Sequence, residues 1–201
     1  MKKKLLNKAL NIIKKERKDT TEEELEIIAY GLEAIYLMIT KLIIIFIIAY
    51  FLNIFKQTLL FFTAYGVIRT FASGYHASTS LSCFIISSTL LLGGTYLSMI
   101  INVDLVFKII ISLICIILLY KYAPADTVKR PLVNVKKRKR WKIISTSLGI
   151  IYLILIILFN NIYFSNYLLV GLIIATLLIL PITYKIFKSP YNNYLNYQPT
   201  V

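Results

Sequence analysis

Residues 103–142 read VDLVFKIIISLICIILLYKYAPADTVKRPLVNVKKRKRWK, an apolar run that passes directly into a basic block. The run 103–122 is long enough to cross a membrane, because one crossing needs about 20 mostly apolar residues. Residues 123–142 then carry eight Lys or Arg and one acidic residue, a net charge of +7. Basic loops between apolar segments stay on the cytoplasmic side. The stretch therefore predicts a polytopic membrane protein with this basic loop in the cytoplasm.

The composition of the whole chain agrees with a membrane protein. Its 201 residues are 58% hydrophobic, and the mean hydropathy is +0.74. A soluble globular domain needs less apolar sequence, and a disordered chain could not contain it. Lys/Arg runs can also neutralise nucleic-acid phosphates, but here long apolar runs flank the basic loop. We therefore expect membrane lipid, and no nucleic acid, as a partner.

Six apolar runs are candidate membrane segments, and a helical bundle is the expected fold. They lie at 35–55, 57–72, 80–101, 103–122, 143–160 and 164–187. The second is weak, because only residues 58–68 are strongly apolar before Arg69, so it is either short and oblique or a re-entrant hairpin. The fold class is thus all-α: a polytopic membrane helical bundle forming a single membrane-embedded domain over 1–201.

The N-terminal region is expected to form two helices outside the membrane core. Residues 1–18 carry a net charge of +7 and an apolar stripe with helical spacing. This amphipathic helix either lies on the inner membrane surface or packs on its own protein. Thr20 and Thr21, followed by Glu23 and Glu24, form a capping-box signal for a second helix. Residues 1–34 are therefore assigned to cytoplasmic or interfacial helices.

Charge also predicts the orientation of the segments. Four segments over 35–122 separate the basic N-terminus from the basic cytoplasmic loop 123–142, and two more occupy 143–187. The tail 188–201 follows lysines that also favour the cytoplasm. Both termini are therefore expected there, in a multi-pass protein of the cell membrane.

The stretch RTFASGYHASTSLSC, residues 69–83, contains the chemistry-bearing residues. His76 is the only histidine of the chain, and Cys83 is one of two cysteines. These counts exclude a disulfide scaffold, a cysteine-based metal cluster and a multi-histidine metal site. With Ser80 as N-cap, Cys83 lies in the first helical turn, where the helix dipole favours a thiolate.

The spacing of His76 and Cys83 constrains how they could act together. On an unbroken helix, positions seven apart are separated by ~10.5 Å along the axis, so direct contact requires a bend. Gly74 and the Ser/Thr run supply places for one; otherwise a scissile bond could lie between the two side chains. A contacting imidazole could serve as general base and acid for a cysteine nucleophile. The residues alone also permit a packing cysteine and an interfacial histidine, whereas Cys115 favours packing only.

Two further charged residues have open roles. Arg69 can pair with Glu33, with a substrate carboxylate or with lipid phosphate. Glu33 lies near the start of the first segment, where a carboxylate is costly enough to imply a partner or a role.

Together these motifs resemble the accessory gene regulator protein B (AgrB) family of membrane cysteine endopeptidases in Gram-positive quorum sensing. The His-x6-Cys spacing, combined with an Ala-Pro-Ala-Asp segment before a basic loop, is the most specific part of the resemblance. The stretches that carry it are Tyr30–Glu33, Ile48–Phe55, Arg69–Cys83, Tyr122–Asp126 and Lys129–Pro131.

The resemblance implies a function. His76 is then the general base, and Cys83 is the nucleophile that cleaves the acidic C-terminal tail from an AgrD-like precursor peptide. The acyl-enzyme then permits closure of a thiolactone or lactone ring, without metal or cofactor. Arg69, Gly74, Glu33, Ser80 and Asp126 are expected to support the site or bind substrate.

Two details of the resemblance depart from the family pattern. Ser73-Gly74 keeps one of the two glycines found in many members, and some members have an amide residue at the position of Glu33, which weakens a catalytic role there. The resemblance also implies homodimerisation. The alternative function is non-enzymatic transport or export of the signal peptide, with His76 and Cys83 structural.

Overall fold

The computed structural model describes residues 13–14, 21–77, 79–128, 131–159 and 163–195. The expected amphipathic helix within 1–18, together with Lys129 and Arg130, lies outside these residues except for positions 13–14. The chain divides into two compact units, residues 1–48 and 49–201. Each unit is described by itself.

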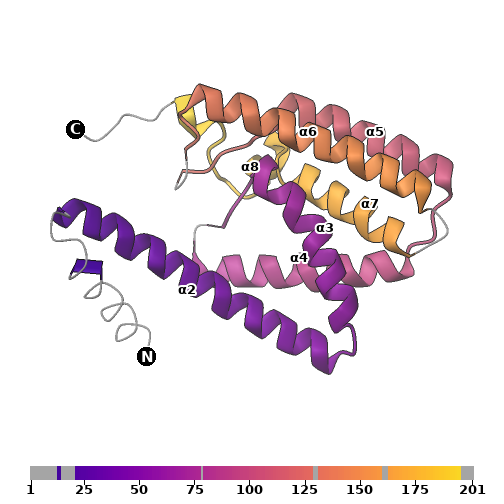
Figure 1. The fold of residues 1–201 in the computed structure, drawn as a ribbon, viewed down its shortest axis with the longest axis horizontal. Coiled ribbons are helices and arrows are strands. Elements are labelled where there is room, and N and C mark those ends of the chain that lie inside the picture. Colours follow the sequence, from indigo (N-terminus) through magenta and orange to yellow (C-terminus); the bar gives the residue numbers. More distant parts are fainter. Residues whose placement is uncertain (1–12, 15–20, 78, 129–130, 160–162, 196–201) are drawn as a thin grey trace. The chain divides into compact units, whose positions relative to one another are not determined.

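The described residues form an all-α structure, as the sequence predicts (Figure 1). Seven α-helices are followed by one short 3-10 helix in this part of the chain. They are α2 (Glu22–Phe51), α3 (Phe55–Ala72), α4 (Ser80–Ile100), α5 (Leu105–Tyr122), α6 (Val135–Leu158), α7 (Phe164–Leu177), α8 (Pro181–Ile186) and η1 (Asn193–Leu195).

Within the described residues, four helices are long and apolar enough to cross a membrane: α2, α4, α5 and α6. The remaining two expected segments are also helical in this part of the chain and correspond to α3 and to α7 with α8. The second segment is α3, a continuous helix of 18 residues and not a re-entrant hairpin, and Lys56 and Arg69 reduce its apolar character. The last segment is interrupted, because α7 ends at Leu177 and Pro181 begins α8. Proline has no amide hydrogen to continue a helix but is well tolerated in its first turn.

The basic loop is shorter than expected. Helix α6 begins at Val135, so most of the Lys/Arg cluster lies on its first turns and not in a loop. The Asn134 side chain accepts a hydrogen bond from Lys137 N (3.1 Å) and caps this helix. An N-cap of this kind starts a helix even where the following residues are charged.

The predicted capping box of the second helix is present. Thr21 N donates to Glu24 Oε2 (3.1 Å), and Glu24 N donates to Thr21 Oγ1 (3.3 Å). The two reciprocal bonds satisfy backbone amides that the first turn leaves unpaired, so α2 begins at Glu22.

Helix α7 lies at the centre of the unit formed by residues 49–201. It packs against α3, α4, α5 and α6, and ten of its fourteen residues are buried. Figure 1 shows α5 and α6 side by side with α7 next to them. A helix that is apolar on all sides is a core helix, which explains why α7 is shorter than a membrane crossing.

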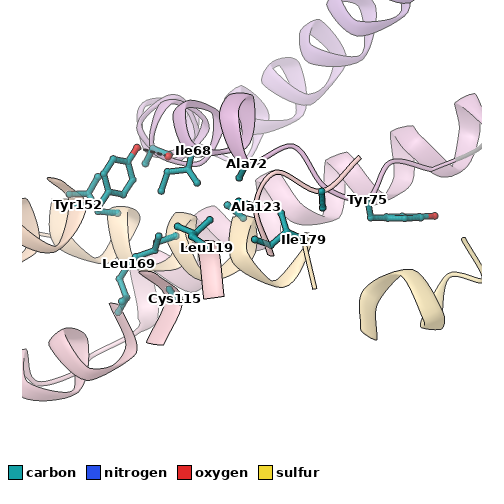
Figure 2. Packing of buried hydrophobic residues seen from close by; sticks show 14 of the residues in the cluster. Ile68, Ala72, Tyr75, Cys115, Leu119, Ala123, Tyr152, Leu169 and Ile179 are labelled. Carbon is teal, nitrogen blue, oxygen red and sulfur yellow. Dashed lines mark hydrogen bonds between the residues drawn. The ribbon is translucent and has the colours of Figure 1, made fainter. Parts of the chain in front are cut away.

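The core cluster extends from the helices to the segment that holds His76. In Figure 2, Tyr152 lies at one end of the drawn cluster and Tyr75 at the other. At the Tyr152 end, its hydroxyl donates to Ala64 O of α3 (2.7 Å). Gly171 of α7 also allows close approach there, because a Cβ at this position would lie 3.1 Å from Tyr65 N. The core therefore fixes α3, whose C-terminal end leads into the site.

Candidate active site

His76 and Cys83 are brought together at the junction of α3 and α4. Helix α3 ends at Ala72, α4 begins at Ser80, and the described residues between them, 73–77 and 79, are not helical. This break lets His76 Nε2 approach Cys83 Sγ to 3.8 Å. The bend that direct contact requires is therefore present, and no scissile bond needs to bridge two distant side chains.

The start of α4 differs from the expected one. The N-cap is Thr79 and not Ser80, because the Thr79 side chain accepts the Ser82 amide (3.2 Å). Ser80 is the first helical residue, and Cys83 still lies in the first turn. Thr79 O accepts the Cys83 amide (3.0 Å), so neither of these two amides is open to an oxyanion. The helix dipole remains available to favour a thiolate at this end.

The side chains of His76 and Cys83 are oriented by further contacts. His76 Nδ1 lies 3.2 Å from Ala77 O, where a protonated Nδ1 donates and leaves Nε2 facing the sulfur. On the other side, Cys83 Sγ lies 4.0 Å from Ser87 Oγ, one turn further along α4. His76 is exposed and Cys83 is half-buried, so the pair can be reached from outside the protein.

The electrostatics of the pair favour a protonated imidazole. The hydrogen bond to Cys83 raises the pKa of His76 above its ordinary value of 6.5, partial burial opposes this, and the thiolate charge adds to the increase. Burial, and to a lesser degree Cys83, also raises the pKa of Tyr75. An imidazolium beside a thiolate is the ion pair that cysteine nucleophiles use.

Arg69 holds the backbone of the loop that carries His76. Its guanidinium donates to the carbonyl oxygens of Ser73 and Tyr75, and to Gly74 O at 3.2 Å. A planar fork with five N–H donors can reach several carbonyls at once, which lysine cannot do. The described contacts of Arg69 are therefore with backbone carbonyls, a role that the sequence did not predict.

Gly74 is required by the geometry of this loop. Its φ is +107°, and a Cβ there would clash with the Arg69 guanidinium and lie 2.7 Å from Leu178 O. Its amide donates to Ala125 O (2.7 Å), and the next amide, that of Tyr75, donates to Leu178 O (2.8 Å). The loop is therefore docked on two segments distant in sequence.

Asp126 is buried and holds one of these segments in place. It is 3% exposed, and its carboxylate accepts the amides of Leu132 (3.3 Å), Asn193 (2.9 Å) and Tyr194 (2.7 Å). A buried carboxylate is stable when several donors satisfy it. The role of Asp126 in the described structure is thus to join the segment after α5 to the C-terminal segment.

Glu33 is not placed with the other predicted site residues. It is half-buried in α2 and belongs to the unit formed by residues 1–48. Arg69, Gly74, His76, Cys83 and Asp126 all belong to the other unit. The pairing of Arg69 with Glu33 stays a prediction.

The sequence analysis missed the aromatic residues that support the loop. The Tyr75 ring stacks on Phe187 (centroids 4.4 Å apart) and meets Tyr184 edge-on (6.0 Å). The available signal was the repeat of aromatic residues every three or four positions from the end of the last apolar run onward: Tyr184, Phe187, Tyr191 and Tyr194.

Among the described residues, no three His, Cys, Asp or Glu side chains are grouped closely enough to hold a metal ion.

Comparison with known proteins gives a consistent family. The family model Accessory gene regulator B matches residues 6–180. A Clostridium acetobutylicum protein described as AgrB-like is 30% identical over 85% of this chain and 82% of its own length. The accessory gene regulator protein B of Staphylococcus aureus strain MW2 is 33% identical over 77% of this chain and 82% of its own length.

A more extensive match covers almost the whole chain. An AgrB-like protein of Listeria innocua is 29% identical over 93% of this chain and 92% of its own length. No solved structure matches the chain.

Proposed function

This chain belongs to the accessory gene regulator B family, and on that premise we propose that it is a membrane cysteine endopeptidase. Its substrate is an AgrD-like precursor peptide of a quorum-sensing system. Cys83 is the nucleophile, His76 is the general base and acid, and the product is a peptide ready for ring closure. The observation that carries the proposal is the 3.8 Å separation of Cys83 Sγ and His76 Nε2 in a bend between two helices.

The first half of the reaction releases the precursor tail. The Cys83 thiolate attacks the carbonyl carbon after the signal region, forming a C–S bond and a tetrahedral oxyanion. Collapse of this intermediate breaks the C–N bond, and the His76 imidazolium gives its Nε2 proton to the departing amine. The tail leaves with a free amino terminus, and the signal region remains on Cys83 as a thioester.

The second half closes the ring. An internal Cys or Ser of the bound peptide attacks the thioester carbonyl, while neutral His76 accepts the proton of the attacking group. The new thioester or ester bond forms as the bond to Cys83 breaks, which returns the thiolate–imidazolium pair. A thioester suits this step because its acyl-transfer potential is high enough to allow ring closure.

Partners and orientation extend the proposal. We place the end of the bundle that carries His76 and Cys83 on the cytoplasmic side, with both termini, because Trp141, in the basic first turns of α6, meets Phe71 at the end of α3 edge-on (6.5 Å). A cytosolic precursor then reaches the exposed imidazole without crossing the membrane. Homodimerisation remains an inference from family membership.

The competing function is export of the peptide without catalysis. Co-expression with a precursor tagged at both ends separates the two, because only a peptidase releases the C-terminal tag. We expect Cys83→Ala and His76→Ala, at normal membrane abundance, to reduce tail release by at least about 10³-fold. Cys115→Ala, which removes the other thiol, should release the tail at the normal rate. Tail release by Cys83→Ala would exclude the mechanism.

A further inference from the structure

Tyr184 of α8 lies where the supports of the His76 loop meet. It is 1% exposed, although α8 has only six residues and follows the last core helix. Its hydroxyl donates to Asp126 O (2.8 Å), and its ring meets the Tyr75 ring edge-on, with centroids 6.0 Å apart. One side chain therefore contacts both the segment after α5 and the residue directly before His76.

The loop that carries His76 is held at two points, which we call its anchors. Tyr184 contacts the chain at or next to each of them. The first anchor is Ala125, which precedes Asp126, accepts the Gly74 amide (2.7 Å) and donates to Ala72 O (3.1 Å). The second anchor is Tyr75, whose ring Tyr184 and Phe187 contact from two directions. A shift of Tyr184 would therefore move both anchors, and with them the backbone on either side of the His76 position.

The C-terminal segment is itself fastened to the same place. The Asp126 carboxylate accepts the amides of Asn193 (2.9 Å) and Tyr194 (2.7 Å), and the Arg138 guanidinium lies 3.3 Å from the centre of the Tyr194 ring. The Tyr191 ring packs edge-on against Tyr184 at 5.0 Å. The segment from α8 to η1 thus forms a clamp, which we define as residues 184–194.

We propose that Tyr184 is a positioning residue for His76, and that the clamp holds the imidazole within reach of Cys83. This inference rests on the proposed function of the pair. It assigns a role in catalysis to a segment beyond residue 180, where the family match ends.

Physical reasons make the pair sensitive to such a support. The separation of 3.8 Å between sulfur and nitrogen is already long for proton transfer, so a small displacement of the loop removes the contact. Burial raises the pKa of the Tyr184 hydroxyl, so it remains a neutral donor to Asp126 O across the working pH range. The hydrogen bond from Tyr184 to Asp126 O is therefore kept over the pH range in which the Cys83–His76 pair changes its protonation.

The test compares two tyrosines with the same chemistry. Tyr184→Phe removes one buried hydroxyl that donates to a backbone carbonyl next to the site. Tyr152→Phe removes an equivalent bond, to Ala64 O (2.7 Å), between α6 and α3 away from the loop. Phe187→Leu is a second variant, since Phe187 is exposed and its replacement removes only the stacking on Tyr75.

Two measurements are made on each purified full-length variant. The first is the rate of iodoacetamide alkylation of Cys83 against pH, in a Cys115→Ala background so that one thiol reports. The second is tail release from the tagged precursor, separated into kcat and KM. The alkylation experiment needs no precursor, so it tests positioning even if the proposed peptidase function fails in the Cys83→Ala experiment.

We expect Tyr184→Phe to lower kcat by about ten- to a hundredfold with KM nearly unchanged, because it misplaces the base and not the substrate. The alkylation profile should shift to higher pH, toward that of an unpaired thiol. Phe187→Leu should shift it in the same direction by less, and Tyr152→Phe should not shift it. The inference is overturned if Tyr184→Phe and Phe187→Leu both keep the wild-type profile, or if Tyr152→Phe shifts it as much.

Discussion

Cys83 and Cys115 carry the same thiol in two different surroundings. Cys83 lies in the first turn of α4, half-buried, with His76 Nε2 at 3.8 Å and Ser87 Oγ at 4.0 Å. Cys115 lies in the middle of α5, 6% exposed, within the apolar core cluster and with Thr176 as its hydrogen-bonding neighbour. The first thiol faces a group that can exchange a proton, and the second faces a neutral hydroxyl.

The difference teaches that a loop, and not the helix itself, brings a proton-exchanging side chain to Cys83. Both cysteines belong to long apolar helices, but only Cys83 is met by a backbone segment docked from outside its helix. That segment is held by Arg69, by the φ of Gly74 and by contacts to Ala125 and Leu178. Changes in the support should therefore act on Cys83 chemistry and spare Cys115 packing.

The largest effect is expected from Gly74→Ala. A Cβ at φ +107° is strained and would meet the Arg69 guanidinium and Leu178 O, so the loop must move. We expect tail release to fall by about a hundredfold. The matched control is Gly93→Ala in α4, where nothing lies within 4 Å of the added Cβ. Normal activity in Gly74→Ala would show that the docked loop does not control Cys83.

A smaller loss is expected from Arg69→Lys. Lysine keeps the positive charge but replaces the fork that reaches three backbone carbonyls with a single ammonium group. Activity should fall by about tenfold, and Arg69→Gln should be less active still. Full activity with lysine, measured at equal membrane abundance, would indicate that charge alone matters at this position.

The pH dependence of His76 protonation is a further way to compare the two cysteines. Because Cys83 raises the pKa of His76 above 6.5, the imidazolium persists above that pH and is lost as the pH rises through the raised pKa. Cys83→Ala removes the main cause, so the pKa of His76 should fall. NMR titration of the single histidine measures this directly. Cys115→Ala should leave the titration in place, and an unchanged pKa in Cys83→Ala would refute the coupling.

The smallest effect is expected at the other thiol. Cys115→Ala leaves a small void in the core, which should lower the free energy of unfolding by about 1 kcal/mol. Thermal melting in detergent measures this change. A large loss of tail release without a matching loss of stability would contradict the packing role of Cys115.

The helical fold and the local chemistry could be predicted because they depend on near neighbours in sequence. Apolar runs predicted the helices, and the Thr21–Glu24 capping box predicted where α2 begins. The spacing of His76 and Cys83 predicted that direct contact would need a bend between them, but left a continuous helix open. The N-cap of α4 was misassigned by one residue, because Thr79 and Ser80 have similar capping preferences. Helix ends are commonly displaced by this amount.

The supports of the site could not be predicted because they join distant segments. The bonds of Gly74 to Ala125, of Tyr75 to Leu178 and of Tyr184 to Asp126 depend on how the helices pack. The central place of α7, which packs against four other helices, likewise depends on contacts between distant segments. Apolar composition alone does not distinguish a lipid-facing helix from a core helix.

The acyl-enzyme offers the most direct test of the central claim, that Cys83 and not Cys115 performs acyl transfer. The purified protein is mixed with its doubly tagged AgrD-like precursor, quenched in acid and digested, and each cysteine peptide is weighed by mass spectrometry. We predict that the N-terminal part of the precursor is attached to Cys83 through a bond that hydroxylamine cleaves, with Cys115 unmodified. Two results would contradict the account. One is tail release by the wild-type protein without this adduct, even when the precursor lacks its ring-closing residue. The other is an adduct on Cys115.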